Sequence, residues 1–194
     1  IALKLNTPEG AKTVRVRFPS DDEWTARQRR RKVIVKNLGR GMSETSVAGS
    51  EEIDAALVGK IRLEEENPVE VDPFEATRII EQLSQAEVDD VVQAGGAFRV
   101  LTRVLGGTTT HVLKMPSAKN VIEYRRGFLR SVDLPYGKQE ITVNLGVAGT
   151  LYDKLSEEID GYAGQVPIVH KAVAVRAAID ALDMAFQEDR DANF

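Results

Sequence analysis

Two Gly-Gly pairs, at residues 95–96 and 106–107, divide the stretch EVDDVVQAGGAFRVLTRVLGGTTTHVLKMPS into three runs. Each run is roughly seven to nine residues long, and glycine accepts the positive φ that tight hairpin turns require. In the middle run, the even-numbered residues from Phe98 to Val104 point to one face of a strand and the odd-numbered residues from Arg99 to Leu105 point to the other. Both sets include apolar side chains. The stretch therefore predicts a three-stranded antiparallel meander that is covered on one face and partly covered on the other.

The N-terminal region predicts a hairpin followed by a helix. IALKLN and KTVRVRF alternate apolar with polar residues, and TPEG separates them, which is typical of a β-hairpin. Ser20 and Glu23 have the capping-box spacing, in which each side chain binds the other residue's free backbone N–H. We expect this helix to continue through the basic residues that follow and to end at Gly39 and Gly41. We expect the stretch GRGMSETSVAGS, residues 39–50, to be a mobile loop that serves as a hinge or an extended arm.

The remaining elements complete the expected fold. A second helix begins at Ser50, because residues 53, 57 and 61 form one apolar stripe. A third begins at Pro73, with Asp72 as N-cap and Glu75 at N3. We also expect a helix over 117–132, a turn over 133–139, a strand over 140–147, a helix over 149–162 and an alanine-rich helix from Pro167. These elements predict an α+β fold: an antiparallel β-meander with several flanking helices and an N-terminal β-hairpin plus helix. We place the domain boundary between an N-terminal region, 1–49, and an α+β body, 50–194.

Composition excludes several classes of protein. The 194 residues are 42% hydrophobic and 29% charged, which is typical of a folded chain. The formal net charge of -4 provides no global attraction to nucleic acid. The absence of cysteine excludes disulfides, thiolate zinc sites, iron–sulfur clusters and cysteine nucleophiles. No apolar run approaches the roughly 20 residues that span a bilayer, and the first residues do not resemble a signal peptide. We therefore expect no membrane partner and a location in the cytoplasm of a host cell or in a virion.

Candidate catalytic residues are few. His111 lies in a predicted strand with the nearest acids far away in sequence, and His170 lies near the start of the last helix, so we interpret both as structural. Two isolated histidines do not have the spacing of a zinc site. LGGTTT lacks the lysine and the spacing of a P-loop, and the acids at 64–66 are interpreted as a solvated segment. We expect no enzymatic activity and no cofactor.

The basic run is the strongest functional signal. From Arg27 to Lys36 the chain has six basic residues and no acids, and Trp24 precedes them. The run permits three interpretations: a solvated helix whose acids and cations suit its dipole, a protein interface, or a site that contacts nucleic-acid phosphates. The first requires no partner, and the third lacks the stacking aromatics that would accompany it. As candidate partner-binding residues we name Trp24, Arg27, Arg29, Arg30, Arg31 and Lys32.

Two stretches, RFPSDDEWTARQRRRKVIV and VLKMPSAKNVIEYRR, resemble uncharacterised proteins encoded among bacteriophage and prophage structural genes, including tail-region proteins. The resemblance carries no catalytic motif. It implies a non-enzymatic part of a virion or of its assembly. We therefore expect a structural or assembly protein that acts through protein–protein contacts, and the alternative is a nucleic-acid-associated protein that uses residues 27–36.

Self-association is expected through the last helix. Small side chains let helices approach closely, and packing within the monomer is the alternative explanation for them. The alanines concerned are Ala172, Ala174, Ala177, Ala178 and Ala181. The expected partners are thus further copies of the chain or other structural proteins.

Overall fold

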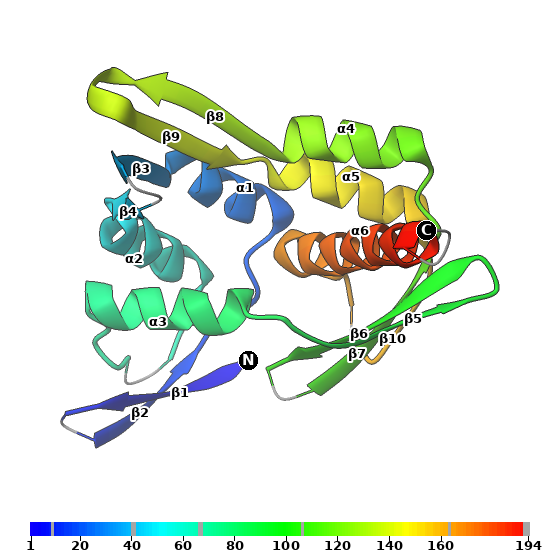
Figure 1. Cartoon of the computed structure of the whole chain (residues 1–194). Coiled ribbons are helices and arrows are strands. Elements are labelled where there is room, and N and C mark those ends of the chain that lie inside the picture. Colours follow the sequence, from blue (N-terminus) through cyan, green and yellow to red (C-terminus); the bar gives the residue numbers. More distant parts are fainter. Residues whose placement is uncertain (9, 40–41, 66–67, 106, 163, 192–194) are drawn as a thin grey trace. The chain divides into compact units, whose positions relative to one another are not determined.

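The computed structural model describes residues 1–8, 10–39, 42–65, 68–105, 107–162 and 164–191, and it has the α+β class that the sequence predicts (Figure 1). The chain divides into two compact units. Unit 1 comprises Ile1–Ser84 and Leu129–Asn144, and unit 2 comprises Gln85–Phe128 and Leu145–Phe194. The chain therefore passes from one unit to the other three times. These units are defined by contacts and not by independent folding, so the domain boundary between residues 49 and 50 stays a prediction.

Unit 1 contains a hairpin, three helices and a four-stranded antiparallel sheet. The hairpin consists of β1 (Ala2–Thr7) and β2 (Gly10–Arg15), and the helices are α1 (Asp21–Arg30), α2 (Ser50–Ile61) and α3 (Pro73–Ser84). The sheet has the order β4-β3-β9-β8, formed by β4 (Met42–Ala48), β3 (Lys32–Gly39), β9 (Lys138–Val143) and β8 (Leu129–Leu134). A short 3-10 turn, η1 (Pro135–Gly137), joins β8 to β9.

The core of unit 1 lies among its hairpin and helices. Helix α2 packs against α3, and α3 contacts β1. The hairpin and the helices both contribute fully buried side chains. The largest are Leu5, Val14, Trp24, Ile61, Ile79, Ile80 and Leu83. The apolar stripe expected on α2 thus has its partner surface within unit 1, because Leu57 and Ile61 are buried. The capping pattern expected at α3 is also present, since the Glu75 N–H donates to Asp72 Oδ1 over 2.7 Å.

Unit 2 is the predicted meander with helices on one face. Its sheet has the order β10-β7-β6-β5, formed by β5 (Glu87–Ala94), β6 (Ala97–Val104), β7 (Gly107–Lys114) and β10 (Ser156–Asp160). Its helices are α4 (Ala118–Phe128), α5 (Leu145–Leu155) and α6 (Ile168–Asp191). Helix α6 contacts β5, β6 and β7, and α5 contacts β7 (Figure 1). The even-numbered residues from Phe98 to Val104 are buried on the face that these helices cover, as the alternation predicts.

The structure corrects several predicted boundaries. The helix expected to reach Gly39 ends at Arg30, because the β-branched residues 33–35 form β3 instead. Residues 42–48, expected to be a loop, form β4 on the edge of the sheet beside β3. Gly41, expected together with Gly39 to mark the end of the first helix, lies outside the described residues. The helix expected over 117–132 ends at Phe128, and the following residues form β8.

Two further corrections concern unit 2. The strand expected over 140–147 ends at Val143, and Leu145 begins α5. Helix α5 ends at Leu155, earlier than residue 162, because residues 156–160 pair with β7 as β10. In both cases pairing with a distant strand decides the local structure. The alanines of α6 favour packing within unit 2, since Ala172, Ala174 and Ala178 are buried there. No helix among the described residues is long and apolar enough to cross a bilayer.

Candidate partner-binding surfaces of unit 1

Helix α1 begins with the capping box that the sequence predicts. The Glu23 N–H donates to Ser20 Oγ over 3.2 Å, and the Ser20 N–H donates to Glu23 Oε2 over 2.8 Å. Arg17 holds the same carboxylate through two hydrogen bonds of 2.7 and 2.8 Å. The hydrogen bond from Arg17 is the main cause that lowers the pKa of Glu23 to about 2, and it outweighs the opposing effect of burial. The first turn of α1 is therefore fixed by charge-assisted bonds.

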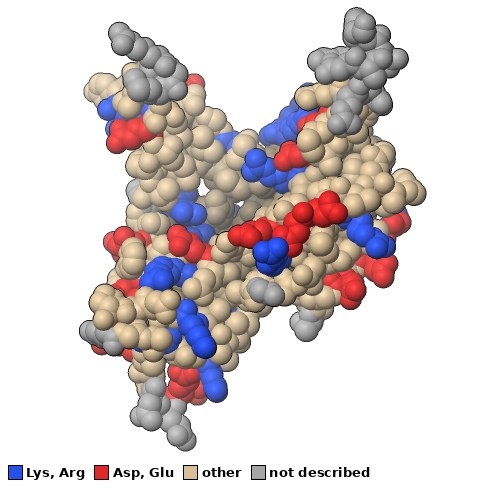
Figure 2. Space-filling model, turned by 60° about the horizontal axis from the view of Figure 1, so that its bottom comes forward, with Lys and Arg blue, Asp and Glu red and all other residues tan. Residues whose placement is uncertain are grey.

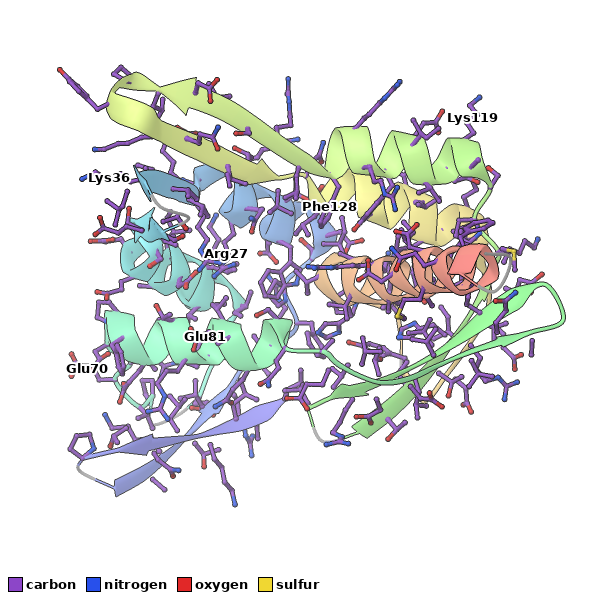
Figure 3. The ribbon with its side chains drawn as sticks, viewed as in Figure 1. Arg27, Lys36, Glu70, Glu81, Lys119 and Phe128 are labelled. Atoms are coloured by element: carbon purple, nitrogen blue, oxygen red, sulfur yellow. The ribbon has the colours of Figure 1, made fainter. Side chains whose placement is uncertain are left out.

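The middle of α1 turns two of the predicted partner-binding residues inward. Trp24 is only 1% exposed and Arg27 only 8% exposed. The Arg27 Nε and Nη2 atoms donate to the two carboxylate oxygens of Asp54 on α2, over 2.6 and 3.1 Å. Figure 3 shows the Arg27 side chain between the two helices. The structure thus places Arg27 inside unit 1, where Asp54 neutralises its charge, and not on an exposed face of the helix.

The sequence contained a signal for this pair that its analysis missed. Asp54 precedes Leu57, Val58 and Ile61 at the spacing i, i+3, i+4, i+7, which places an acid on the buried stripe of α2. Arg27 follows the buried Trp24 by three residues, so the two share a face of α1. A buried acid requires a cation. The charges of α1, taken alone, do not connect the two positions.

The other four predicted residues do not form one helical patch. Arg29 and Arg30 are exposed at the end of α1, and Lys32 is exposed at the start of β3, where its Nζ lies 3.9 Å from Glu140 Oε2. Arg31 is half-buried, and burial, followed by the neighbouring Arg27 charge, lowers its pKa. On the face drawn in Figure 2, basic and acidic side chains are interspersed. The basic run is thus divided between a helix, its end and a strand.

A groove of about 250 Å³ lies between α1 and α2. Its rim carries charges of both signs, and alanine and larger apolar side chains line the rest. The lining residues are Asp22, Glu23, Ala26, Arg27, Arg30, Ile53, Ala56, Leu57 and Lys60. This lining contains no serine, cysteine or histidine that could act as a nucleophile or base.

The four-stranded sheet of unit 1 is the larger candidate surface. Among its described side chains, none is buried. The apolar side chains of β3 and β9 are half-buried, apart from Leu38 on β3, which is 50% exposed. Val132 on β8 is 59% exposed. At the tip of the β8–β9 hairpin Tyr136 is 93% exposed and has φ of 63°, a left-handed conformation that is costly for a residue with a bulky side chain.

The histidines of unit 2 have structural surroundings. His111 Nε2 lies 3.0 Å from Thr102 Oγ1, and His111 Nδ1 lies 2.7 Å from the Tyr152 hydroxyl. Burial, with a smaller contribution from His170, lowers the pKa of His111 to about 4. Burial also raises the pKa of Tyr152 to about 12. The hydrogen bonds satisfy a buried imidazole that stays neutral at physiological pH.

His170 on α6 lies 3.1 Å, through its Nδ1, from the Tyr162 hydroxyl. Next to it, Lys171 donates to Asp153 over 2.8 Å. Within the part of the chain that the structure describes, no group of three or more histidine, aspartate or glutamate side chains is arranged to hold a metal ion. The polar residues in the interior of unit 2 are therefore explained by hydrogen bonds to one another.

No protein-family model matches the chain, and no curated protein or solved structure is significantly similar to it.

Proposed function

We propose that the chain is a non-enzymatic structural or assembly protein that acts through protein–protein contacts. The observation that carries this proposal is the sheet of unit 1, in which no described side chain is buried. An antiparallel sheet gains most of its stability when at least one face packs against another layer. A four-stranded sheet without a buried face is suited to completion by another molecule.

The tip of the β8–β9 hairpin supports the same proposal. A tyrosine that is almost fully exposed gains little within the monomer, and its positive φ costs roughly 1 kcal/mol or more. Tyrosine is among the residues that most often anchor protein interfaces, because it buries a large rigid surface and retains a polar group. A contact outside the monomer would offset the backbone cost.

The location of this activity in a phage or prophage particle rests on the resemblance of residues 17–35 and 112–126 to phage structural-region proteins. The proposal of a non-enzymatic role is supported by His111, whose two ring nitrogens are engaged with Thr102 and Tyr152. The proposed location and the proposed non-enzymatic role are both compatible with partners that are further copies of the chain or other proteins of the particle.

Site-specific photo-crosslinking tests the proposal. A photoreactive amino acid at position 132 or 136 is expected to form adducts with virion proteins, or with a second copy of the chain, in cells that assemble the particle. Position 184 on α6, which is also exposed, serves as the control and is expected to give fewer adducts. Adducts to nucleic acid would favour the alternative that residues 27–36 bind phosphates. A lack of adducts at both sheet positions would contradict the proposal.

A further inference from the structure

One face of the unit 1 sheet is rich in cations. The ladder places Lys36 directly opposite Lys138, and the side chains of directly opposed residues share a face. We call this the basic face. Its charged residues are four cations, Lys32, Lys36, Arg130 and Lys138, and two acids, Glu44 and Glu140. All four cations are exposed, and Figure 3 shows Lys36 extending away from β3. Glu44 on β4 is directly opposite Lys36, whereas Lys138 has only Lys36 and Leu134 opposite it. Like charges directly opposed destabilise a sheet, so Lys138 favours an acidic partner.

The unit 2 sheet has the opposite charge on the face that α5 and α6 do not cover. We call this the acidic face. It carries six acids, Glu87, Asp89, Asp90, Glu157, Glu158 and Asp160, and three cations, Arg99, Arg103 and Lys114. Arg103 is paired with Asp89 at 2.8 Å, and Lys114 with Glu157 at 3.7 Å. The ion pairs among the described residues do not include Asp90, Glu158 or Asp160. Three exposed carboxylates are thus available on this face.

The two faces are also similar in form. Each has four antiparallel strands on which apolar and charged side chains alternate. On the basic face Glu140 lies between Ile34 and Val132, and on the acidic face Arg99 lies between Val92 and Val112. Val132 and Val92 are exposed, whereas Ile34 and Val112 are half-buried. Two such faces can stack as sheets do in a sandwich, with the excess charge of one opposed to that of the other.

We propose that the basic face of one copy binds the acidic face of a second copy of this chain. The inference rests on the proposed function, because it identifies the partner of the unit 1 sheet. Each copy carries one face of each kind, so the contact is heterologous and its repetition produces a ring or an open series of copies. A face of four strands, about 19 Å across and about 20 Å long, provides roughly 400 Å² per copy. This is below the usual size of a stable interface, so the contact is weak and self-association is expected only at high protein concentration.

Reciprocal charge reversal tests the contact. Lys36→Glu with Lys138→Glu reverses the basic face, and Asp90→Lys with Glu158→Lys reverses the acidic face. In sedimentation experiments, the average molar mass of the unmodified chain is expected to rise with protein concentration at low salt and to stay at the monomer value in high salt. Each double variant is expected to remain a monomer. An equimolar mixture of the two double variants is expected to associate into a series in which the variants alternate. Each variant retains the face that the other requires, and the two reversed faces are again opposite in charge. The variant with all four changes in one chain is expected to recover self-association.

Matched controls separate this contact from other effects. Lys119→Glu with Arg126→Glu makes the same change in net charge as the basic-face variant, at exposed positions on α4 that belong to neither sheet, and is expected to self-associate normally. Circular dichroism verifies that every variant is folded. An unmodified chain that stays monomeric at the highest concentration reached, or a mixture that fails to associate, would overturn the inference. If crosslinks from position 132 to other virion proteins were still found, the proposed function would stand without it.

Discussion

The two four-stranded sheets of this protein have the same strand number and the same antiparallel pairing, yet they differ in how they are stabilised. In unit 2, α5 and α6 cover one face, and Phe98, Val100 and Leu113 are buried beneath them. In unit 1, none of the described side chains of the sheet is buried, and the core lies among the hairpin and the helices. Backbone pairing alone therefore does not distinguish a sheet that stabilises its own unit from one that is available to a partner.

The largest expected effect tests whether the helices of unit 1, and not its sheet, stabilise it. Arg27→Gln leaves the buried Asp54 carboxylate without its cation, and breaking a buried pair in this way typically costs about 3 kcal/mol or more. We expect the free energy of unfolding, measured with urea, to fall by about this amount. Arg30→Gln, at an exposed position on the same helix, is the control and should change it by less than about 0.5 kcal/mol.

Asp54→Asn combined with Arg27→Gln sharpens this result. Because neither buried charge then remains, the double variant should be more stable than the sum of the two single losses implies. Equal losses for Arg27→Gln and Arg30→Gln would show that the pair contributes nothing to unit 1.

A matched pair of substitutions compares the sheets directly. Val100→Ala removes a fully buried side chain from the unit 2 sheet, and Val132→Ala removes an exposed one from the unit 1 sheet. We expect the first to lower the free energy of unfolding by about 2 kcal/mol and the second by less than about 0.5 kcal/mol, because only the first creates a cavity. Thermal unfolding of both variants provides the measurement. Similar decreases in the free energy of unfolding for both variants would contradict the proposed difference between the two sheets.

Acid should weaken the unit 2 sheet through His111. Its pKa is about 4 in the folded protein and 6.5 in the unfolded chain, so the unfolded state binds more protons between these values. Stability is then complete above pH 6.5 and declines as the pH falls from 6.5 to 4. The difference between pH 8 and pH 5 should be about 2 kcal/mol. The groups around the ring, Thr102, Tyr152 and His170, carry no negative charge in this range that would favour protonation. His111→Gln is expected to remove most of this slope in pH-dependent urea unfolding.

The smallest effect returns to the start of α1. Glu23→Gln removes the carboxylate that Arg17 and the Ser20 N–H hold, and we expect a loss of about 1 kcal/mol because Arg17 is partly exposed. The folded pKa of Glu23 is about 2, below its ordinary 4.5, so its contribution is complete above pH 4.5 and is lost as the pH falls toward 2. Urea unfolding at pH 7 and at pH 3 tests both the loss of stability and its dependence on pH. A variant that is equally destabilised at both pH values would show that the charge is not responsible.

Sequence patterns predicted the parts of the fold that local chemistry determines. The Ser20–Glu23 and Asp72–Glu75 pairs marked helix starts correctly, and the two Gly-Gly pairs marked the meander of unit 2. Strands that depend on distant partners were missed. Residues 32–39 were assigned to a helix because their charges were considered before their β-branched residues, and β10 is a strand only because β7 lies beside it.

For the candidate site, composition located the basic segment but not its burial. The burial of Arg27 depends on its ion pair with Asp54, which is 27 residues away, and no local pattern relates the two. Likewise, the exposure of the β8–β9 hairpin depends on which elements cover its sheet. Partner binding by the exposed residues of the basic segment stays a prediction.

Because the chain passes between its units three times, strands of one sheet become available for pairing at different times during translation. Strand β3 pairs with both β4 and β9, but β9 leaves the ribosome about ninety residues after β4. During that interval the β3–β4 hairpin presents an open edge to every other nascent chain on the same polysome, and such edges are sites of mispairing. Neither unit is a continuous segment, so no single cut yields either one whole. A chain shortened after Ser84 would retain the helices of unit 1 but only β3 and β4 of its four-stranded sheet.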